Sequence, residues 1–209
     1  MLWYNVEKDL GGSDMKRLLI TGFEPFGGEI INPSWEAVSR LADEIGGYSV
    51  TKLSVPVVFD KATECVTNVA DELMPDAIIL VGQAGGRSAI TPELVAINLR
   101  YAKIPDNDGN KPMDESIIRG GENAYFSTLP VRKMAEAIGT LGIPSQVSYS
   151  AGAYVCNDLL YSLLARYDGT GVGICFIHVP YVTEQNKEPA MSLDDIVKGL
   201  TVAIESLDK

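Results

Sequence analysis

The chain of 209 residues has a single histidine, His178, and only three cysteines, Cys65, Cys156 and Cys175. One imidazole and no Cys-x-x-Cys pair leave too few ligands at short spacing for a structural zinc site, so we expect no metal. Three cysteines are an odd set, and their spacing fits no disulfide framework. Free thiols in a reducing compartment are therefore expected, which favours the cytoplasm.

Positive charge is also scarce, and long apolar runs are absent. The sequence holds 17 Lys and Arg residues against 28 Asp and Glu, a formal net charge of −11. A nucleic-acid partner requires a basic face, so this balance argues against one. No apolar stretch approaches the ~20 residues that cross a bilayer, and we expect no membrane association.

The first 14 residues differ from those that follow. The segment MLWYNVEKDLGGSD has no apolar centre and no cationic start, so it is not a secretory signal. We interpret residues 1–14 as a leader, either an alternative start or an artificial addition. Residues 15–209 are then expected to form one catalytic domain, since this length supports one sizeable core.

Short apolar runs alternate with helical patterns from Lys16 onward. The continuous apolar runs are typical of strands that are buried on both faces. This order predicts an α/β fold, a three-layer α/β/α sandwich with a mostly parallel, twisted central sheet. The strands are expected over 16–22, 48–57, 76–82, 93–100, 145–150 and 173–180, the helices over 33–45, 58–73, 130–142, 156–167 and 193–207, and a long polar loop over 104–123.

His178 stands at the end of the apolar run GVGICFIHVPY. In such sheets the working loops leave the carboxyl ends of strands, and the loops after Thr21, Gly82, Ser150 and His178 all qualify. Imidazole is the usual base of a hydrolase near neutral pH, because its pKa lies close to that pH. The alternative is a structural histidine at a strand end.

Cys156 lies in SYSAGAYVCNDLLY, where a strand gives way to a helix through small residues. A thiol in the first helical turn faces unpaired N–H groups and the positive end of the helix dipole, so a lowered pKa is expected. The alternative is a buried, inert cysteine. Cys65 falls in the middle of a helix and Cys175 in the middle of a strand, where nothing local supports reactivity.

Glu93 opens an alternating run directly after Thr91 and Pro92. An acid there can hydrogen-bond the imidazole N–H of a base and fix its tautomer. The alternative is a solvated acid at a strand start. The nearby glycines of GQAGG lack the Lys-Ser/Thr of a phosphate-binding loop and do not fit the dinucleotide pattern, so no nucleotide cofactor is expected.

Four segments together resemble a known family: TGFEPFGGEIINPSWEAV, GQAGGRSAITPELVAIN, SYSAGAYVCNDLLY and FIHVPY. In this order they are similar to the pyrrolidone-carboxylate peptidases (pyroglutamyl peptidase I), cysteine exopeptidases that remove an N-terminal pyroglutamyl residue from peptides. The resemblance runs from about Met15 to near the C-terminus. It implies an α/β/α sandwich, a homo-oligomer that is commonly a tetramer in bacteria, peptide substrates that begin with pyroglutamate, and no cofactor.

The resemblance also assigns the catalytic roles. It implies Cys156 as the nucleophile, His178 as the general base and then acid, and Glu93 as the partner that orients the imidazole. The substrate-binding positions implied are the aromatic walls Phe23 and Phe26, the polar Gln83, and Lys103 and Val155.

Two positions depart from the family pattern. Leu94 stands where a basic residue is usual, and Lys103 stands where many members have Arg, whose planar fork Lys lacks. Arg100 lies nearby in the sequence and is a candidate to compensate. These departures raise the alternative of an inactive relative that binds pyroglutamyl peptide ends. A separate alternative is a cysteine amidase for another cyclic amide, with a changed ring pocket.

Overall fold

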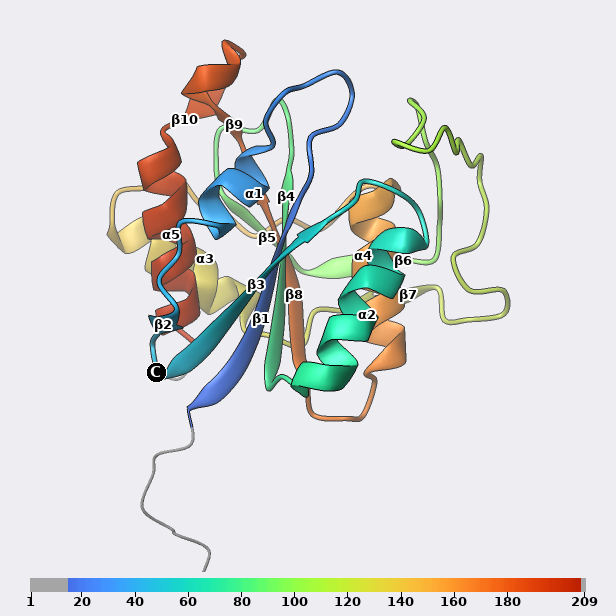
Figure 1. The fold of residues 1–209 in the computed structure, drawn as a ribbon, viewed down its shortest axis with the longest axis horizontal. Coiled ribbons are helices and arrows are strands. Elements are labelled where there is room, and N and C mark those ends of the chain that lie inside the picture. The colour runs from blue at the N-terminus through green and yellow to red at the C-terminus, as the bar shows by residue number, and fades with distance from the viewer. Residues whose placement is uncertain (1–14, 208–209) are drawn as a thin grey trace, which may run out of the picture.

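Six strands form the central sheet, in the order β2-β3-β1-β4-β8-β5 (Figure 1). The four inner strands β3, β1, β4 and β8 run parallel, and the two edge strands are antiparallel to their neighbours. The computed structural model describes residues 15–207, so the expected leader 1–14 lies outside the described residues. The strands are β1 (Lys16–Phe23), β2 (Glu44–Ile45), β3 (Tyr48–Val55), β4 (Ala77–Gln83), β5 (Thr91–Glu93) and β8 (Gly173–Val179).

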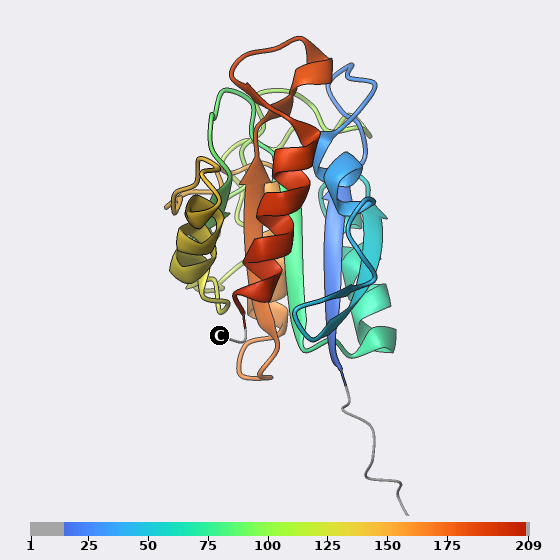
Figure 2. The ribbon, with the colours of Figure 1, turned by 90° about the vertical axis from the view of Figure 1, so that its left-hand side faces the viewer.

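Helices cover both faces of this sheet (Figure 2). On one face α1 (Pro33–Val38), α3 (Val131–Thr140) and α5 (Leu193–Glu205) close one apolar cluster, and on the other α2 (Lys61–Leu73) and α4 (Val155–Arg166) close a second. Successive strand residues feed the two clusters alternately, because side chains alternate across a strand. The predicted three-layer α/β/α sandwich with a mostly parallel sheet is confirmed.

Two helices begin at polar residues whose side chains cap them. The Asn32 side chain accepts a hydrogen bond from the Ser34 backbone N–H at 3.1 Å, and Pro33 occupies the first turn. The Ser192 hydroxyl accepts one from the Asp195 N–H, also at 3.1 Å. Each cap satisfies a donor that the first turn leaves unpaired.

The helix predicted over 33–45 is wrong beyond Val38. Its second half instead supplies β2, which pairs with the start of β3 around Gly46 and Gly47. Both glycines have positive φ, +56° and +86°, as tight hairpins with two left-handed central residues require. Pairing with the sheet edge therefore prevails over the helical pattern of this segment.

The prediction of a single strand over 93–100 is also wrong, because this segment is divided between two strands. The chain leaves the main sheet after Glu93, and β6 (Val95–Ile97) pairs with β7 (Ala124–Phe126) in a separate two-stranded sheet. The short strand expected over 145–150 is replaced by isolated bridges from Ser145 and Ser148 to the β5 segment. The sequence did not predict the pair β9 (Tyr181–Val182) and β10 (Ala190–Met191), or the 3₁₀ turn Thr183–Gln185.

The long polar loop over 104–123 contains no helix or strand, as predicted. Asp106 organises its first part by accepting hydrogen bonds from the backbone of Phe59, Asp108 and Asn110. The Asn107 amide then donates to the carbonyl of Pro25 at 3.0 Å. These contacts tie the loop to the segments that follow β1 and β3.

No helix among residues 15–207 has the length and apolar character that crossing a bilayer requires.

Candidate active site

His178 lies near the carboxyl end of β8, between Gly82 of β4 and Thr91 of β5. Its side chain projects from the same face as that of Phe176, because residues two apart in a strand share a face. The two ring centroids are 4.6 Å apart. The packed phenyl ring therefore limits the orientations that the imidazole can adopt.

Glu93 holds the imidazole through its other nitrogen. Oε1 of Glu93 lies 2.7 Å from Nδ1 of His178, and the residues are 0% and 4% exposed. An ionised carboxylate only accepts hydrogen bonds, so Nδ1 carries the proton and Nε2 keeps its lone pair. This tautomer is the one that a general base at Nε2 requires.

Burial and nearby charge set the protonation states of this pair. Burial lowers the pKa of His178, and its hydrogen bond with Glu93 only partly opposes the effect. Burial also works to raise the pKa of Glu93, but hydrogen bonds and charge from His178, Ser148 and Arg87 outweigh it, and this pKa lies below its ordinary value. A neutral imidazole therefore faces a charged carboxylate at neutral pH.

Cys156 is the second residue of α4, as the sequence predicted for a first-turn thiol. A Cβ atom at Gly82 would lie 3.1 Å from its sulfur and 2.6 Å from Cζ of Phe176. Gly82 pairs in register with His178, so its missing side chain leaves room for the sulfur on the face from which the imidazole projects. Cys156, His178 and Glu93 thus come together from three separate segments.

The expected lowering of the Cys156 pKa is wrong. Burial raises the pKa of this thiol to about 12, and the negative charge of Glu93 adds to the effect. The positive charge of Arg87 and the backbone N–H of Cys156 oppose it without reversing it. The resting thiol is therefore protonated at neutral pH, because dehydration destabilises the thiolate more than the helix N-terminus stabilises it.

A cavity of about 260 Å³ opens beside the N-terminus of α4, the helix that carries Cys156. Two predicted substrate-binding residues, Phe26 and Lys103, line it, and the Phe26 and Tyr154 rings lie 6.5 Å apart between centroids. The sequence did not predict the other four lining residues as substrate-binding, although Tyr154 lies two positions before Cys156 in the motif SYSAGAYVCNDLLY. The full lining is Phe26, Tyr101, Lys103, Ile104, Ala153 and Tyr154.

The other three predicted substrate-binding residues lie outside this lining. Phe23 is 2% exposed and packs on Phe176, with ring centroids 6.3 Å apart. Val155 is fully buried in the core under α4. Gln83 is half-buried at the end of β4, where its side-chain oxygen accepts a hydrogen bond from the Gln185 amide at 2.9 Å.

Leu94 and Glu93 face opposite sides of the sheet. Leu94 packs against the apolar cluster under α1, α3 and α5, whereas Glu93 projects toward His178. The positive partner of Glu93 is Arg87, whose Nη1 lies 2.6 Å from Oε1. Arg87 lies within the motif GQAGGRSAITPELVAIN, but the sequence analysis assigned it no role. A single cation in a Gly-rich loop, six residues before Glu93, was the feature that could have indicated one.

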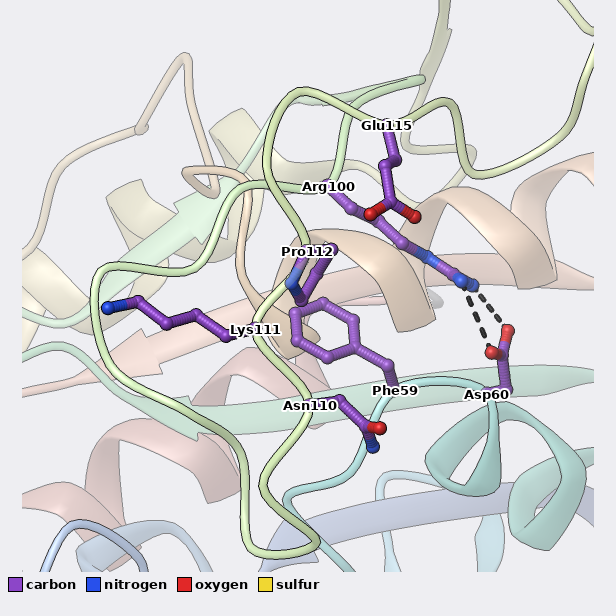
Figure 3. Close-up of a pocket in the computed structure, with 7 residues that line it drawn as sticks. All are labelled: Phe59, Asp60, Arg100, Asn110, Lys111, Pro112 and Glu115. Carbon is purple, nitrogen blue, oxygen red and sulfur yellow. Dashed lines mark hydrogen bonds and ion pairs between the residues drawn. The ribbon is translucent and has the colours of Figure 1, made fainter.

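Arg100 does not compensate for Lys103. It forms an ion pair with Asp60 and a second with the buried Asp158, whose Oδ1 lies 2.6 Å from its Nε. Figure 3 shows Arg100 turned toward Asp60 at the edge of another cavity, of about 330 Å³. Its donors are therefore engaged away from the cavity that Lys103 lines.

Within residues 15–207, no cluster of three or more His, Cys, Asp or Glu side chains has a geometry that could hold a metal ion.

Comparison with known proteins identifies close relatives over nearly the whole chain. A sequence profile of the family described as pyroglutamyl peptidase matches residues 16–209. The chain is 49% identical over 195 residues to the pyrrolidone-carboxylate peptidase of Lactobacillus helveticus, and the alignment covers 91% of this chain and 98% of that relative. It is 50% identical over 201 residues to that of Thermosipho africanus, with 92% and 97% covered.

Solved structures give the same result. The crystal structure of Bacillus amyloliquefaciens pyroglutamyl peptidase I superposes with a TM-score of 0.88 at 48% identity, covering 92% of this chain and 96% of that one. The pyrrolidone carboxyl peptidase of Thermococcus litoralis has a TM-score of 0.89 at 38% identity, with 93% and 94% covered. Sequence and fold agree along the same residues, and the chain belongs to the pyroglutamyl peptidase family.

Proposed function

We propose that the protein is a cysteine exopeptidase that hydrolyses the bond after an N-terminal pyroglutamyl residue of a peptide. One observation carries the proposal: the buried His178–Glu93 hydrogen bond lies at the strand position whose neighbour, Gly82, makes room for the Cys156 sulfur. Nucleophile, base and orienting acid are the three parts that acyl transfer through a thiol needs.

The first half of the reaction forms a thioester. The proton of the Cys156 thiol moves to Nε2 of His178 as the sulfur attacks the pyroglutamyl carbonyl carbon. The tetrahedral intermediate then expels the amine of the following residue, and the imidazolium gives that amine its proton. Glu93 stays ionised throughout and stabilises the imidazolium by accepting from Nδ1.

The second half regenerates the thiol. Water attacks the thioester carbonyl and gives its proton to Nε2 of His178. The intermediate then expels the sulfur, which takes the proton back, and pyroglutamate leaves. The first-turn N–H groups of α4 are suited to stabilise the oxyanion in both halves, because they have no partner within the helix.

The cavity beside Cys156 suits a lactam better than a free N-terminus. Phe26 and Tyr154 offer flat apolar walls to the five-membered ring. Of the six residues that line the cavity, only Lys103 is charged. A positive group there repels an α-ammonium but not a neutral lactam, so charge supports selection of the blocked N-terminus. Gln83, Phe23 and Val155 lie outside this lining, so in this proposal they support the walls of the site and do not themselves touch the ring.

The alternative of an inactive relative rests on Leu94 and Lys103, and the position of Leu94 weighs against it. Leu94 projects away from Glu93, and Arg87 supplies the positive charge that Glu93 contacts. The other departure, Lys103, keeps a positive charge at the cavity. The remaining alternative is an amidase for another cyclic amide. Turnover of pyroglutamyl substrates also tests this alternative, since such an enzyme would prefer a different ring.

Three further proposals concern domain organisation, assembly and location. Residues 15–209 act as one catalytic domain, the protein assembles as a homo-oligomer, a tetramer in its family's bacterial members, and it works in the cytoplasm. The three cysteines are all free in the structure, which agrees with a reducing compartment.

Replacing Cys156 by Ala should abolish turnover of a pyroglutamyl fluorogenic amide at pH 7–8 under reducing conditions. We expect kcat to fall by about 10⁴-fold or more, because the nucleophile is lost while the fold is kept. Cys65→Ala is the matched control, since Cys65 lies on α2, and it should retain wild-type activity. Equal activity in both variants, or no turnover by reduced wild-type protein, would refute the assignment.

Replacing Phe26 by Ala should weaken kcat/KM for pyroglutamyl substrates by about 30-fold, which corresponds to ~2 kcal/mol of apolar contact with the lactam ring. Phe126→Ala is the control, because Phe126 is 67% exposed on β7. If the two variants have the same kcat/KM, Phe26 does not form a wall of the substrate site.

Alkylation of Cys156 by iodoacetamide in the free enzyme should accelerate about tenfold per pH unit between pH 7 and 10. The thiolate is the reactive form, and a pKa of about 12 keeps its fraction rising throughout this range. Mass spectrometry of the Cys156 peptide gives the rate at each pH. A plateau below pH 9 would instead mean that a thiolate–imidazolium pair exists before substrate binds.

A further inference from the structure

Arg87 connects three parts of the active site from the loop between β4 and β5. Its Nη1 donates to Oε1 of Glu93 and to Oγ1 of Thr91, at 2.6 Å each. Its Nη2 donates to the backbone carbonyl of Ser150 at 3.2 Å. The Arg87 side chain is 31% exposed, whereas the Glu93 side chain that it contacts is fully buried.

We propose that Arg87 is a positioning residue that holds the Glu93 carboxylate in place for His178 and, with the same guanidinium, fixes the loop that leads into Cys156. This inference rests on the proposed peptidase function, in which these three residues act together. The rigid fork of an arginine suits the task, since its nitrogens can reach separate acceptors at fixed angles.

The carboxylate needs this second donor. Oε1 of Glu93 is shared between Arg87 and His178, at 2.6 and 2.7 Å. Oε2 is buried without a hydrogen-bond partner of normal geometry, although Ser148 lies close enough to lower the pKa of the carboxyl. Without Arg87, the imidazole would be left as the main partner of a buried anion, and the carboxylate would be freer to turn.

The contact with Ser150 extends the same restraint toward the nucleophile. The loop is already paired with the β5 segment at Ser148, through backbone hydrogen bonds with Pro92 and Leu94. Arg87 adds a point of attachment two residues further along, just before Gly152, whose φ is +80°. The loop therefore approaches Cys156 from a fixed position.

Arg87 also has an electrostatic effect that a purely structural side chain would not have. Its charge lowers the pKa of both His178 and Cys156, whereas Glu93 raises both. The other groups that face the imidazole are neutral: Gly82 on β4, Thr91 on β5, the Phe176 ring on β8 and the protonated thiol of Cys156 on α4. Removing Arg87 should therefore raise the pKa of His178.

The test compares R87M and R87K with wild-type protein and with R132Q as the matched control. Arg132 approaches the same loop from outside, where its guanidinium lies 5.9 Å from the Tyr149 ring centroid. The readouts are kcat and KM for a pyroglutamyl fluorogenic amide, and the NMR titration of His178 in untagged protein. Because His178 is the only histidine in the chain, its resonance needs no assignment.

We expect R87M to lower kcat by about 10- to 100-fold, the usual effect of removing a group that orients a catalytic one, with KM changed less than threefold. Its His178 titration should move to higher pH. R87K keeps the charge but not the fork, so it should retain a titration near that of wild type and recover only part of kcat. R132Q should match wild type in both readouts.

The proposal is overturned if R87M keeps kcat within twofold of wild type, or if its His178 titration is the same as in R132Q. Should R87M fail to fold, R87K decides: wild-type kcat in R87K would contradict the need for the fork. If wild-type protein shows no turnover, the peptidase assignment fails, and the His178 titration still tests the effect of Arg87 independently.

Discussion

The hydrogen bond between Glu93 and His178 is the interaction on which the rest of the site depends. It joins two strands across the sheet edge, at residues 85 positions apart in the sequence, with an Oε1–Nδ1 distance of 2.7 Å. Because the pair is buried, it fixes the imidazole's tautomer as well as its orientation. Two neighbours support this pair: Phe176 packs on the ring, and Gly82 leaves space beside it for the Cys156 sulfur.

The energetics of the site follow from its burial. Dehydration favours the neutral forms of thiol and imidazole, whereas Glu93 keeps its charge because donors surround one of its oxygens. In the mechanism we propose, charge therefore develops only as the sulfur attacks, and it develops where Glu93 and the N-terminus of α4 stabilise it. In the same proposal, the cavity beside α4 binds the substrate, and its apolar walls and single cation favour a neutral ring over an ammonium.

The sequence predicted the layers and the inner strands, because long apolar runs such as 76–82 and 173–180 leave few alternatives. His178 and Glu93 lie at the ends of strands and Cys156 lies in the first turn of α4, and the structure brings these three predicted residues together. Other features depend on contacts that no local pattern encodes. Arg87 reaches Ser150, 63 residues away, the strand breaks at Leu94 to pair with β7, and the pKa of Cys156 is set by burial rather than by its helix position.

In the proposed mechanism, acyl transfer passes through a thioester on Cys156. The most direct measurement mixes the enzyme with an activated pyroglutamyl ester, quenches in acid within milliseconds to seconds, and maps the modified peptide by mass spectrometry. We expect a pyroglutamyl adduct on the peptide that contains Cys156, which disappears as turnover ends. A burst of product with the adduct on another side chain, or with no adduct at any time, would contradict it.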